Sequence, residues 1–327
     1  MIKSLFALLT ASALAALLGS CTSISETQLN GDTGNGLTGP GYLYAGIFGN
    51  DGIFRSTDNA QNWTRIVSGL TNDSVFAFAA NGPFMFAGTY GGGIFRSNDN
   101  GNDWTAVNTG LTNFQIASLI SSGQALCAGT YNSSIGTGNM FRSTDEGDHW
   151  SGTDFSGGPS VRAVARLGSF LFAASQSGGG IFRSSDNGSS WVPLSELASS
   201  TTYCLSASGS TLFAGTENGL FLSHDNGVTW QPTAVQGEVW SCYANGSTAL
   251  AALFNGELFQ SSDGGETWGS SSFTFESNHI DAFVDNGHTI FAGTAGNGVF
   301  ASTDNGLTWT AANKGMESEY VWTAAFH

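Results

Sequence analysis

The sequence has few basic residues and few cysteines, and both shortages exclude classes of function. Its 327 residues contain 9 Lys and Arg against 25 Asp and Glu, a formal net charge of −16 at pH 7. This acidity argues against nucleic acid and bare anionic membranes as partners, because both attract basic proteins. The 4 cysteines and 5 histidines are dispersed along the chain, which argues against a disulfide framework and against a metal site.

A hydrophobic run near the N-terminus is too short for a comfortable membrane span. Residues 5–18 follow Lys3 and consist mostly of Ala and Leu. The run ends in LGSC, residues 18–21, which resembles the lipobox of bacterial lipoproteins. The resemblance implies cleavage before Cys21 and lipid attachment at that cysteine. We therefore predict a lipoprotein signal peptide over residues 1–20.

The next stretch reads as a flexible tether. Residues 22–40 contain no aromatic residue and few apolar ones, so they cannot bury enough surface to order themselves. We predict a lipidated Cys21 and tether over residues 21–40, followed by a folded body over residues 41–327. Thr22 stands where an inner-membrane retention aspartate can follow the lipid cysteine, so the resemblance implies the outer membrane of a bacterial envelope.

Three further cysteines, Cys127, Cys204 and Cys242, lie in apolar runs of the body. We expect buried free thiols, since unpaired cysteine behaves as a small apolar side chain. Cys204 and Cys242 occupy corresponding strands of consecutive repeats, so a disulfide between them is an alternative.

One eight-residue unit recurs seven times along the body. The copies begin at Ser56, Ser97, Ser143, Ser184, Ser223, Ser261 and Ser302, spaced 41, 46, 41, 39, 38 and 41 residues apart. The third residue of each copy is an aspartate: Asp58, Asp99, Asp145, Asp186, Asp225, Asp263 and Asp304. The eighth is a tryptophan: Trp63, Trp104, Trp150, Trp191, Trp230, Trp268 and Trp309. A period of about 40 residues is typical of propeller blades.

Each repeat carries four short apolar runs joined by turn signals. In residues 74–111, VFAFAA and FMFAGT flank Asn81-Gly82, GIFRS follows, and DWTAV comes after the eight-residue unit. The first repeat lacks an initial run, and residues 320–327 supply one with nothing after it. We therefore predict an all-β, seven-bladed β-propeller of four-stranded antiparallel blades, closed by the C-terminal strand joining the N-terminal blade.

The eight-residue unit spans the turn between the third and fourth strands. Its aspartate can accept hydrogen bonds from turn amides, and Asn-Gly supplies the positive φ of the reversal. The tryptophan would start the fourth strand and cover the turn. Seven near-identical active sites are implausible, and a lone aspartate is a poor cation cage. The unit is thus predicted to be structural, with no metal and no cofactor.

The unit resembles the Asp box, also called the bacterial neuraminidase repeat, over nearly all of residues 41–327. The resemblance implies the propeller fold without implying an activity. Asp-box propellers include sialidases, xyloglucan-cleaving glycosidases, sortilin-type peptide receptors and a photosystem II assembly factor that is itself a seven-bladed lipoprotein.

When the predicted first strands of the seven repeats are aligned, one position holds residues of many types, and the next position holds only small residues. We call these positions the variable column and the uniform column. The variable column is Phe76, Ala117, Arg162, Tyr203, Trp240, Asp281 and Trp322. The uniform column is Ala77, Ser118, Ala163, Cys204, Ser241, Ala282 and Thr323, which suits close packing near the axis. We predict a ligand-binding rim opposite the eight-residue units, formed by Phe76, Arg162, Tyr203, Trp240, His279, Asp281, Tyr320 and Trp322. The alternative is that these rings only fill the wide end of the channel.

Catalysis is a rival interpretation. A sialidase of this kind clamps its substrate with three arginines, and only Arg162 and Arg166 remain once structural positions are removed. A xyloglucanase-like inverting pair needs two carboxylates roughly 6.5–9.5 Å apart. Asp281 with Glu238 or Glu319, on adjacent blades, is the only candidate.

We therefore predict a non-catalytic binding or assembly module that is monomeric and takes a glycan, a peptide or a protein of the cell envelope. A glycoside hydrolase working from Asp281, Glu238 and Glu319 is the first alternative. An assembly factor akin to the photosystem protein is the second.

Overall fold

A computed structural model describes residues 21–22, 41–49, 51–131, 140–156, 158, 160–176, 179–273, 275, 279–316 and 320–327. The predicted signal peptide, residues 23–40 of the predicted tether, and Glu319 lie outside the described residues. The described chain consists of strands and turns, and no helix in it is long and apolar enough to span a bilayer.

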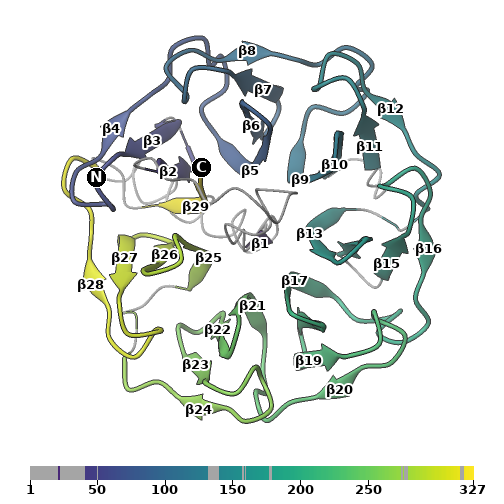
Figure 1. The fold of residues 1–327 in the computed structure, drawn as a ribbon, viewed down its shortest axis with the longest axis vertical. Helices are drawn as coiled ribbons and strands as arrows, with labels where there is room; N and C mark the ends of the chain where they lie inside the picture. The colour runs from purple at the N-terminus through teal and green to yellow at the C-terminus, as the bar shows by residue number, and fades with distance from the viewer. Residues whose placement is uncertain are drawn as a thin grey trace, which may run out of the picture.

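Seven four-stranded antiparallel sheets stand in a ring around a central axis, which confirms the predicted seven-bladed β-propeller (Figure 1). The innermost strands are β29 (Val321–Phe326), β5 (Val75–Asn81), β9 (Ile116–Ser122), β13 (Val161–Leu167), β17 (Thr202–Ser208), β21 (Val239–Asn245) and β25 (Ile280–Asp285). The second strands are β2 (Leu43–Ile47), β6 (Phe84–Thr89), β10 (Ala125–Thr130), β14 (Phe170–Ser175), β18 (Thr211–Thr216), β22 (Thr248–Leu253) and β26 (Ile290–Thr294).

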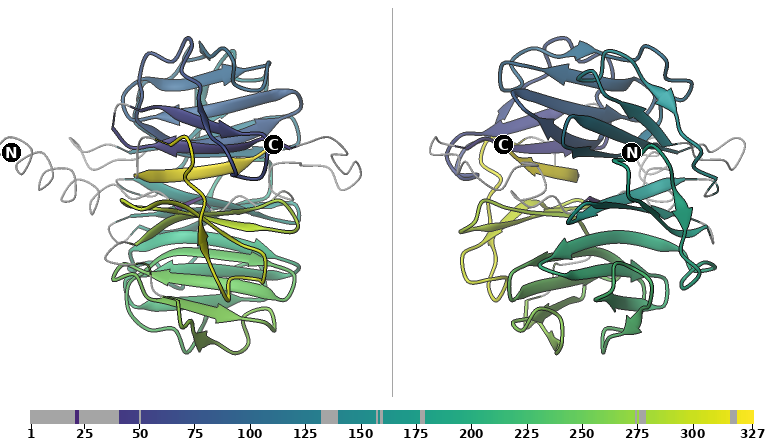
Figure 2. Two further views of the ribbon diagram at one scale, coloured as in Figure 1. Left: turned by 90° about the vertical axis from the view of Figure 1, so that its left-hand side faces the viewer. Right: turned by 45° about the vertical axis from the view of Figure 1, so that its right-hand side comes forward.

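The third strands are β3 (Ile53–Ser56), β7 (Gly93–Ser97), β11 (Met140–Ser143), β15 (Gly180–Ser184), β19 (Gly219–Ser223), β23 (Leu258–Ser261) and β27 (Gly298–Ser302). The outermost strands are two residues each: β4 (Thr64–Arg65), β8 (Thr105–Ala106), β12 (Ser151–Gly152), β16 (Val192–Pro193), β20 (Gln231–Pro232), β24 (Gly269–Ser270) and β28 (Thr310–Ala311). Figure 2 shows the blades from the side, their strands running between the two faces of the disc.

The ring closes through the two ends of the folded body. Strand β29 pairs antiparallel with β2, from Leu43 opposite Phe326 to Ile47 opposite Val321. Beyond the strands, the backbones of Tyr42 and His327 exchange two hydrogen bonds of 2.6 and 2.8 Å. The predicted closure by the C-terminal strand is therefore confirmed.

Neighbouring blades pack closely because the second strands carry glycine where the next blade presents a branched side chain. A Cβ built at Gly88 would lie 2.5 Å from Ile116 Cγ2, and one at Gly129 would lie 2.7 Å from Val161 Cβ. Gly46, Gly215 and Gly293 receive valines of the following blade in the same way. The small column predicted to lie near the axis is buried throughout.

Cys127, Cys204 and Cys242 are all buried thiols outside any disulfide, so the alternative of a Cys204–Cys242 disulfide is wrong. Both side chains belong to one apolar cluster between their blades, where they pack as small hydrophobic groups. A two-residue strand, β1 (Cys21–Thr22), pairs in parallel with β17 at Cys204 and Leu205 and lies near the centre of the ring (Figure 1).

The eight-residue units are hydrogen-bonded turns, as predicted. In the last copy, Ser302 Oγ donates to Asp304 Oδ1 at 2.8 Å and accepts from the Gly306 amide at 2.8 Å. The Asp304 carboxylate also accepts from the amide and the hydroxyl of Thr308 at 2.9 and 2.6 Å. The turn uses two consecutive left-handed residues, Asn305 at φ 60° and Gly306 at φ 89°.

The tryptophans of the units lie one residue before the outermost strands, so the prediction that they start these strands is wrong. The backbone amides of Trp63, Trp104 and Trp150 form hydrogen bonds outside their own sheet, because they donate to carbonyls of the preceding blade at 2.8–2.9 Å. A residue whose amide donates to another blade cannot also donate to the neighbouring strand of its own sheet. The indoles of Trp63 and Trp150 donate to the preceding blade as well.

Arginines directly before the first serine of four of the units reach the turn of the next blade. Arg96 donates to the Glu146 carbonyl at 2.7 Å and to Asp148 at 2.8 Å, and Arg183 donates to the Asn226 carbonyl at 3.0 Å. Arg55 and Arg142 make equivalent contacts. These arginines therefore bind blades together on the face that carries the eight-residue units, which we call the unit face.

Candidate functional site

The face opposite the unit face carries the loops that lead into the first and third strands, and we call it the mouth face. Each innermost strand has a β-bulge at its mouth-face end, because the pairing with the second strand skips one residue. The skipped residues are the seven of the variable column: Phe76, Ala117, Arg162, Tyr203, Trp240, Asp281 and Trp322. A bulge re-aims a side chain out of the regular alternation, and bulges are common beside functional sites.

We number the blades along the chain, blade one being the blade that contains β2 and β29. Blades four to seven bring four of the bulge residues together in what we call the Trp240 cluster. It consists of Arg162, Tyr203, Trp240, Phe254, His279 and Asp281. The Arg162 guanidinium lies 4.0 Å from the centroid of the Trp240 ring system and 4.6 Å from that of Tyr203. Arg162 and Trp240 are each 1% exposed. A cation held over two aromatic faces in a desolvated place is favourable by about 2 kcal/mol or more.

Asp281 anchors the other side of the Trp240 cluster. Its Oδ1 accepts a hydrogen bond from Trp240 Nε1 at 3.1 Å and lies 3.2 Å from His279 Nε2. The His279 ring stacks on Phe254 at 4.9 Å and meets Trp240 edge-on at 5.2 Å. Asp281 is 1% exposed, and its Oδ2 makes no hydrogen bond to any described residue. A buried carboxylate oxygen without a donor is costly, so this atom marks a place where a donor would bind.

Two glutamates border the Trp240 cluster on blades five and six. Burial raises the pKa of Tyr203, and its hydrogen bond to the Glu238 carboxylate and the charge of that carboxylate raise it further. The Glu238 carbonyl accepts from the Phe254 amide at 3.0 Å, which fixes Phe254 beside Glu238. The Thr201 amide donates to Glu217 at 3.3 Å. The cluster therefore combines rings, carboxylates and one guanidinium at a single place on the mouth face.

A second aromatic group, the Trp322 cluster, lies on blades one to three. It consists of Phe48, Phe76, Tyr90, Tyr131 and Trp322. Phe76 and Trp322 are buried, with ring centroids 5.0 Å apart, and Phe48 and Tyr90 pack on them at 5.5 and 5.4 Å. Its partly buried rings give the mouth face an apolar surface on blades one to three, and Tyr131 lies near enough to Arg162 for the charge of that guanidinium to act on the Tyr131 pKa.

The predicted rim residues thus fall into two groups rather than one continuous ring. Arg162, Tyr203, Trp240, His279 and Asp281 meet in the Trp240 cluster, and Phe76 and Trp322 meet in the Trp322 cluster. Tyr320 is 37% exposed and bridges to Ala295 through the backbone. Of the three candidate acids, Asp281 is buried and Glu238 is half-buried; Glu319 is not among the described residues. Arg166 lies at the unit-face end of β13, donating to the Gly168 carbonyl at 3.1 Å, so it is remote from Arg162.

Sequence reasoning missed a second variable column, which completes both clusters. It consists of the residues directly after the second strands: Phe48, Tyr90, Tyr131, Gln176, Glu217, Phe254 and Ala295. Their amides donate to carbonyls just before the innermost strands of the same blades, for example Tyr90 to Ser74 at 2.9 Å. An aromatic residue directly after an apolar run ending in Gly-Thr was the available signal, at Tyr90 and Tyr131.

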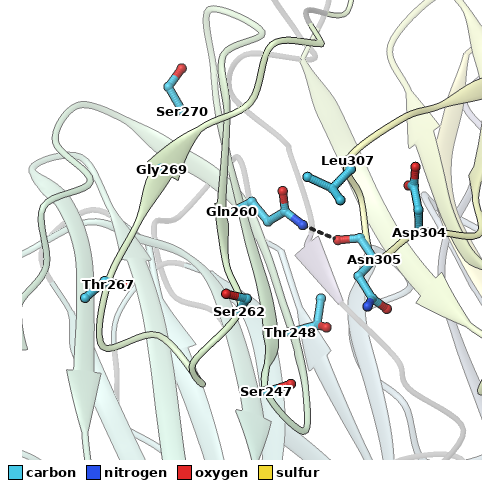
Figure 3. Close-up of a pocket in the computed structure, with 10 residues that line it drawn as sticks. All are labelled: Ser247, Thr248, Gln260, Ser262, Thr267, Gly269, Ser270, Asp304, Asn305 and Leu307. Carbon is cyan, nitrogen blue, oxygen red and sulfur yellow. Dashed lines mark hydrogen bonds between the residues drawn. The ribbon is translucent and has the colours of Figure 1, made fainter.

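The unit face carries shallow polar clefts between blades. One cleft, with a volume of about 430 Å³, lies between blades six and seven and is lined by Thr248, Gln260, Ser262, Asn305 and Leu307 among others (Figure 3). Gln260 crosses it to donate to the Asn305 carbonyl at 2.7 Å. Hydrogen bonds within the turn already occupy Asp304, which lines the same cleft. No three His, Cys, Asp or Glu side chains of the described chain gather as a metal site.

Comparison with known proteins supports the fold. The DUF6242 beta propeller domain matches residues 157–278 of the sequence. No curated protein matches the chain. Among solved structures, YCF48 from Cyanidioschyzon merolae is 15% identical with a TM-score of 0.53, covering 72% of this chain and 84% of its own. YCF48 bound to D1 peptide is 16% identical with a TM-score of 0.58, covering 79% and 92%.

Two further structures resemble only part of longer proteins. The extracellular domain of a protein described as a one-component system from B. thetaiotaomicron is 18% identical with a TM-score of 0.63, over 80% of this chain and 37% of its own. An ancestral GH74 enzyme is 14% identical with a TM-score of 0.52, over 90% and 55%. Identities this low show a shared β-propeller fold and leave the function to be argued from the site.

Proposed function

We propose that this chain is a non-catalytic binding module that holds a glycan, peptide or protein of the cell envelope on its mouth face. The observation that carries the proposal is the bulge at the start of every innermost strand, which takes seven variable residues, most of them buried, out of the strand pairing at the mouth-face end of the ring. A structural ring does not require variety at these positions, because the neighbouring small column already provides the packing. Binding sites combine apolar rings with a few polar groups, as the Trp240 cluster does.

A peptide is the ligand class with the most support. One protein of the same fold, YCF48, has been solved with a D1 peptide bound. The mouth face also carries exposed aromatic side chains on separate blades, Phe114, Phe254 and Tyr320, which suit an extended ligand.

The proposal is tested with two single substitutions of exposed apolar residues on opposite faces. Phe254 is 39% exposed on the mouth face, and Leu307 is 58% exposed on the unit face. The full chain is screened against glycan and peptide arrays, and the best ligand is titrated with the Phe254→Ala and Leu307→Ala variants. We expect Phe254→Ala to weaken binding about tenfold or more, as truncation of an aromatic anchor does, with Leu307→Ala unchanged. Equal affinities of both variants and the parent would rule out the mouth face.

We also propose that the chain is exported and anchored by lipid on Cys21, with the propeller held at the outer membrane. The LGSC sequence before Thr22 supports this proposal. Cells expressing the full chain are labelled with radioactive palmitate. Label in the parent and its loss in Cys21→Ala are the expected results, and label that persists in Cys21→Ala would contradict the anchor.

Glycoside hydrolysis is a second candidate, favoured by the buried Asp281 carboxylate oxygen that has no hydrogen-bond donor while Glu238 borders the same cluster. Hydrolysis of xyloglucan by the full chain, lost in Asp281→Asn and kept in Asp285→Asn, would favour it. Asp285 is a suitable control because it is equally buried in β25 but lies at the far end of that strand.

A further inference from the structure

We propose that the Trp240 cluster binds the lysine or arginine side chain of a basic peptide segment. This inference rests on the proposed binding function of the mouth face and names the chemistry that the face selects. Three independent features carry it: the charge around the cluster, the way its rings already hold one cation, and a buried acceptor without a donor.

The charge around the cluster is negative, and the eight-residue units do not account for it. Glu217, Glu238 and Asp281 all lie outside the units, whose aspartates serve turns on the opposite face. Against these three carboxylates the cluster has one guanidinium, that of Arg162, and a His279 ring next to Asp281. Glu217 is exposed and Glu238 is half-buried, so both carboxylates can meet a ligand. Carboxylates gathered on one part of a surface attract cationic partners and speed their association.

Arg162 shows that the rings of the cluster accept a cation on their faces. Its guanidinium lies over both Trp240 and Tyr203. Phe254 extends the same aromatic surface, with its ring centroid 4.9 Å from that of Trp240, and remains 39% exposed. The Phe254 ring packs on Trp240 and His279, and the Glu238 carboxylate accepts a hydrogen bond from Tyr203, which packs on the same Trp240. An aromatic face and a carboxylate therefore both border the Trp240 ring. This pairing is how proteins recognise ammonium and guanidinium groups.

The buried Asp281 oxygen adds a requirement for a hydrogen-bond donor. Oδ1 is engaged by Trp240 and lies beside His279, whereas Oδ2 makes no hydrogen bond within the described chain. Ammonium and guanidinium groups donate hydrogen bonds and accept none. A neutral sugar would leave the charge of the three carboxylates without a partner, and an acidic ligand would be repelled by them.

A peptide fits the face better than a small amine does. Beyond the cluster, Phe114 before β9 and Tyr320 before β29 expose aromatic side chains on the same face. A free polyamine would use the carboxylates alone, whereas the side chains and backbone of a peptide can also cover these rings.

The test compares matched oligomers on the full chain in low salt: hexalysine, hexaglutamine, hexaglutamate and spermine, with cellohexaose as a neutral sugar. Binding is measured by calorimetry and located by amide hydrogen exchange. We expect hexalysine to bind most tightly and to protect the segments around Tyr203, Glu238 and Phe254. The variants are Glu238→Gln, Phe254→Leu, which keeps an apolar side chain without a ring face, and Glu266→Gln, an exposed acid of the unit face.

Phe254→Leu is expected to weaken hexalysine binding about two- to fivefold through the lost cation–aromatic contact. Glu238→Gln is expected to weaken it as well, and Glu266→Gln to leave it unchanged. If Glu238→Gln and Glu266→Gln weakened hexalysine binding equally, the binding would come from the overall negative charge rather than from the Trp240 cluster, and the inference would be overturned. Spermine binding as tightly as hexalysine would overturn the peptide part.

The same experiment separates this inference from the proposed function. Protection of the mouth face by cellohexaose or hexaglutamine in place of hexalysine would overturn the cationic ligand and keep a binding role for the face. An absence of mouth-face protection by every oligomer, combined with array ligands that bind Phe254→Ala normally, would overturn both.

Discussion

At the scale of single residues, the aspartates of the eight-residue units are the best-defined charged groups in the molecule. Hydrogen bonds from the residue four positions later lower the pKa of Asp225 and Asp263 to about 2, chiefly through its side chain. At Asp145 the backbone amide of His149 is the main cause, and the pKa again falls to about 2. The pKa values of Asp58, Asp99, Asp186 and Asp304 are lowered as well.

These lowered pKa values predict loss of stability in acid. The folded pKa lies below the ordinary value near 3.8, so the stabilisation is complete above about pH 5 and is lost as the pH falls toward 2. Asp263→Asn should lower the free energy of unfolding at pH 7 and should approach the parent near pH 2. Urea unfolding between pH 7 and 2 measures both curves. Glu266→Gln makes the same charge change in the same unit as a control, and parallel curves for Asp263→Asn and the parent would contradict the prediction.

At the scale of strands, two features of the blade come from backbone positions rather than from side-chain chemistry. Glycines of the second strands let the next blade approach, and bulges in the innermost strands take the variable column out of the strand pairing at the mouth-face end. The pattern of apolar runs predicted the strands, but not the role of the second-strand glycines. It did not predict the bulges, because a bulge depends on how two strands pair, and that pairing leaves no mark in the hydrophobic pattern.

A substitution at Gly88 tests the blade packing. Gly88→Ala would place a Cβ 2.5 Å from Ile116 Cγ2, so we expect a loss of about 1–3 kcal/mol in the free energy of unfolding. Gly152 in β12 is also a strand glycine, but an added Cβ there meets no atom within 4 Å. Urea denaturation of Gly152→Ala should therefore give a change within about 0.5 kcal/mol of the parent. Similar values for the two variants would refute close blade packing.

At the scale of the whole molecule, the ring is held shut by one strand drawn from the far end of the chain. Strand β29 supplies the innermost strand of the blade that begins with β2, and it carries Trp322 of the mouth face. Closure thus removes two sheet edges and completes the Trp322 cluster in a single step.

Removal of residues 321–327 should open the ring. We expect loss of the single cooperative thermal transition and formation of oligomers, because exposed strand edges pair with other chains. Removal of His327 alone breaks the two backbone bonds to Tyr42 but leaves β29 in place, and should cost about 1–3 kcal/mol. Calorimetry and light scattering distinguish the two truncations, and a monomeric shortened chain with an unchanged transition would contradict the closure argument.

The sequence alone determined the number of blades, the four strands in each and the closing role of the C-terminal strand. These features follow from two signals in the sequence: a turn motif every 38 to 46 residues, and the missing first apolar run of the first repeat. Turns and short strands are specified by residues that are neighbours in the chain, so the sequence shows them directly. The sequence also identified most residues of the candidate site, since aligned repeats place Arg162, Tyr203, Trp240 and Asp281 in one column.

Only the tertiary structure decided which of those residues meet. The division into two clusters, the position of Arg162 over Trp240, and the addition of Phe254 and Phe48 depend on strand pairing, bulges and contacts between blades. Residues about 40 positions apart are brought together by the curvature of the ring, and no local pattern records the direction in which their side chains turn. The fold was therefore readable from the repeats, whereas the chemistry of the mouth face arose from how the seven sheets pack.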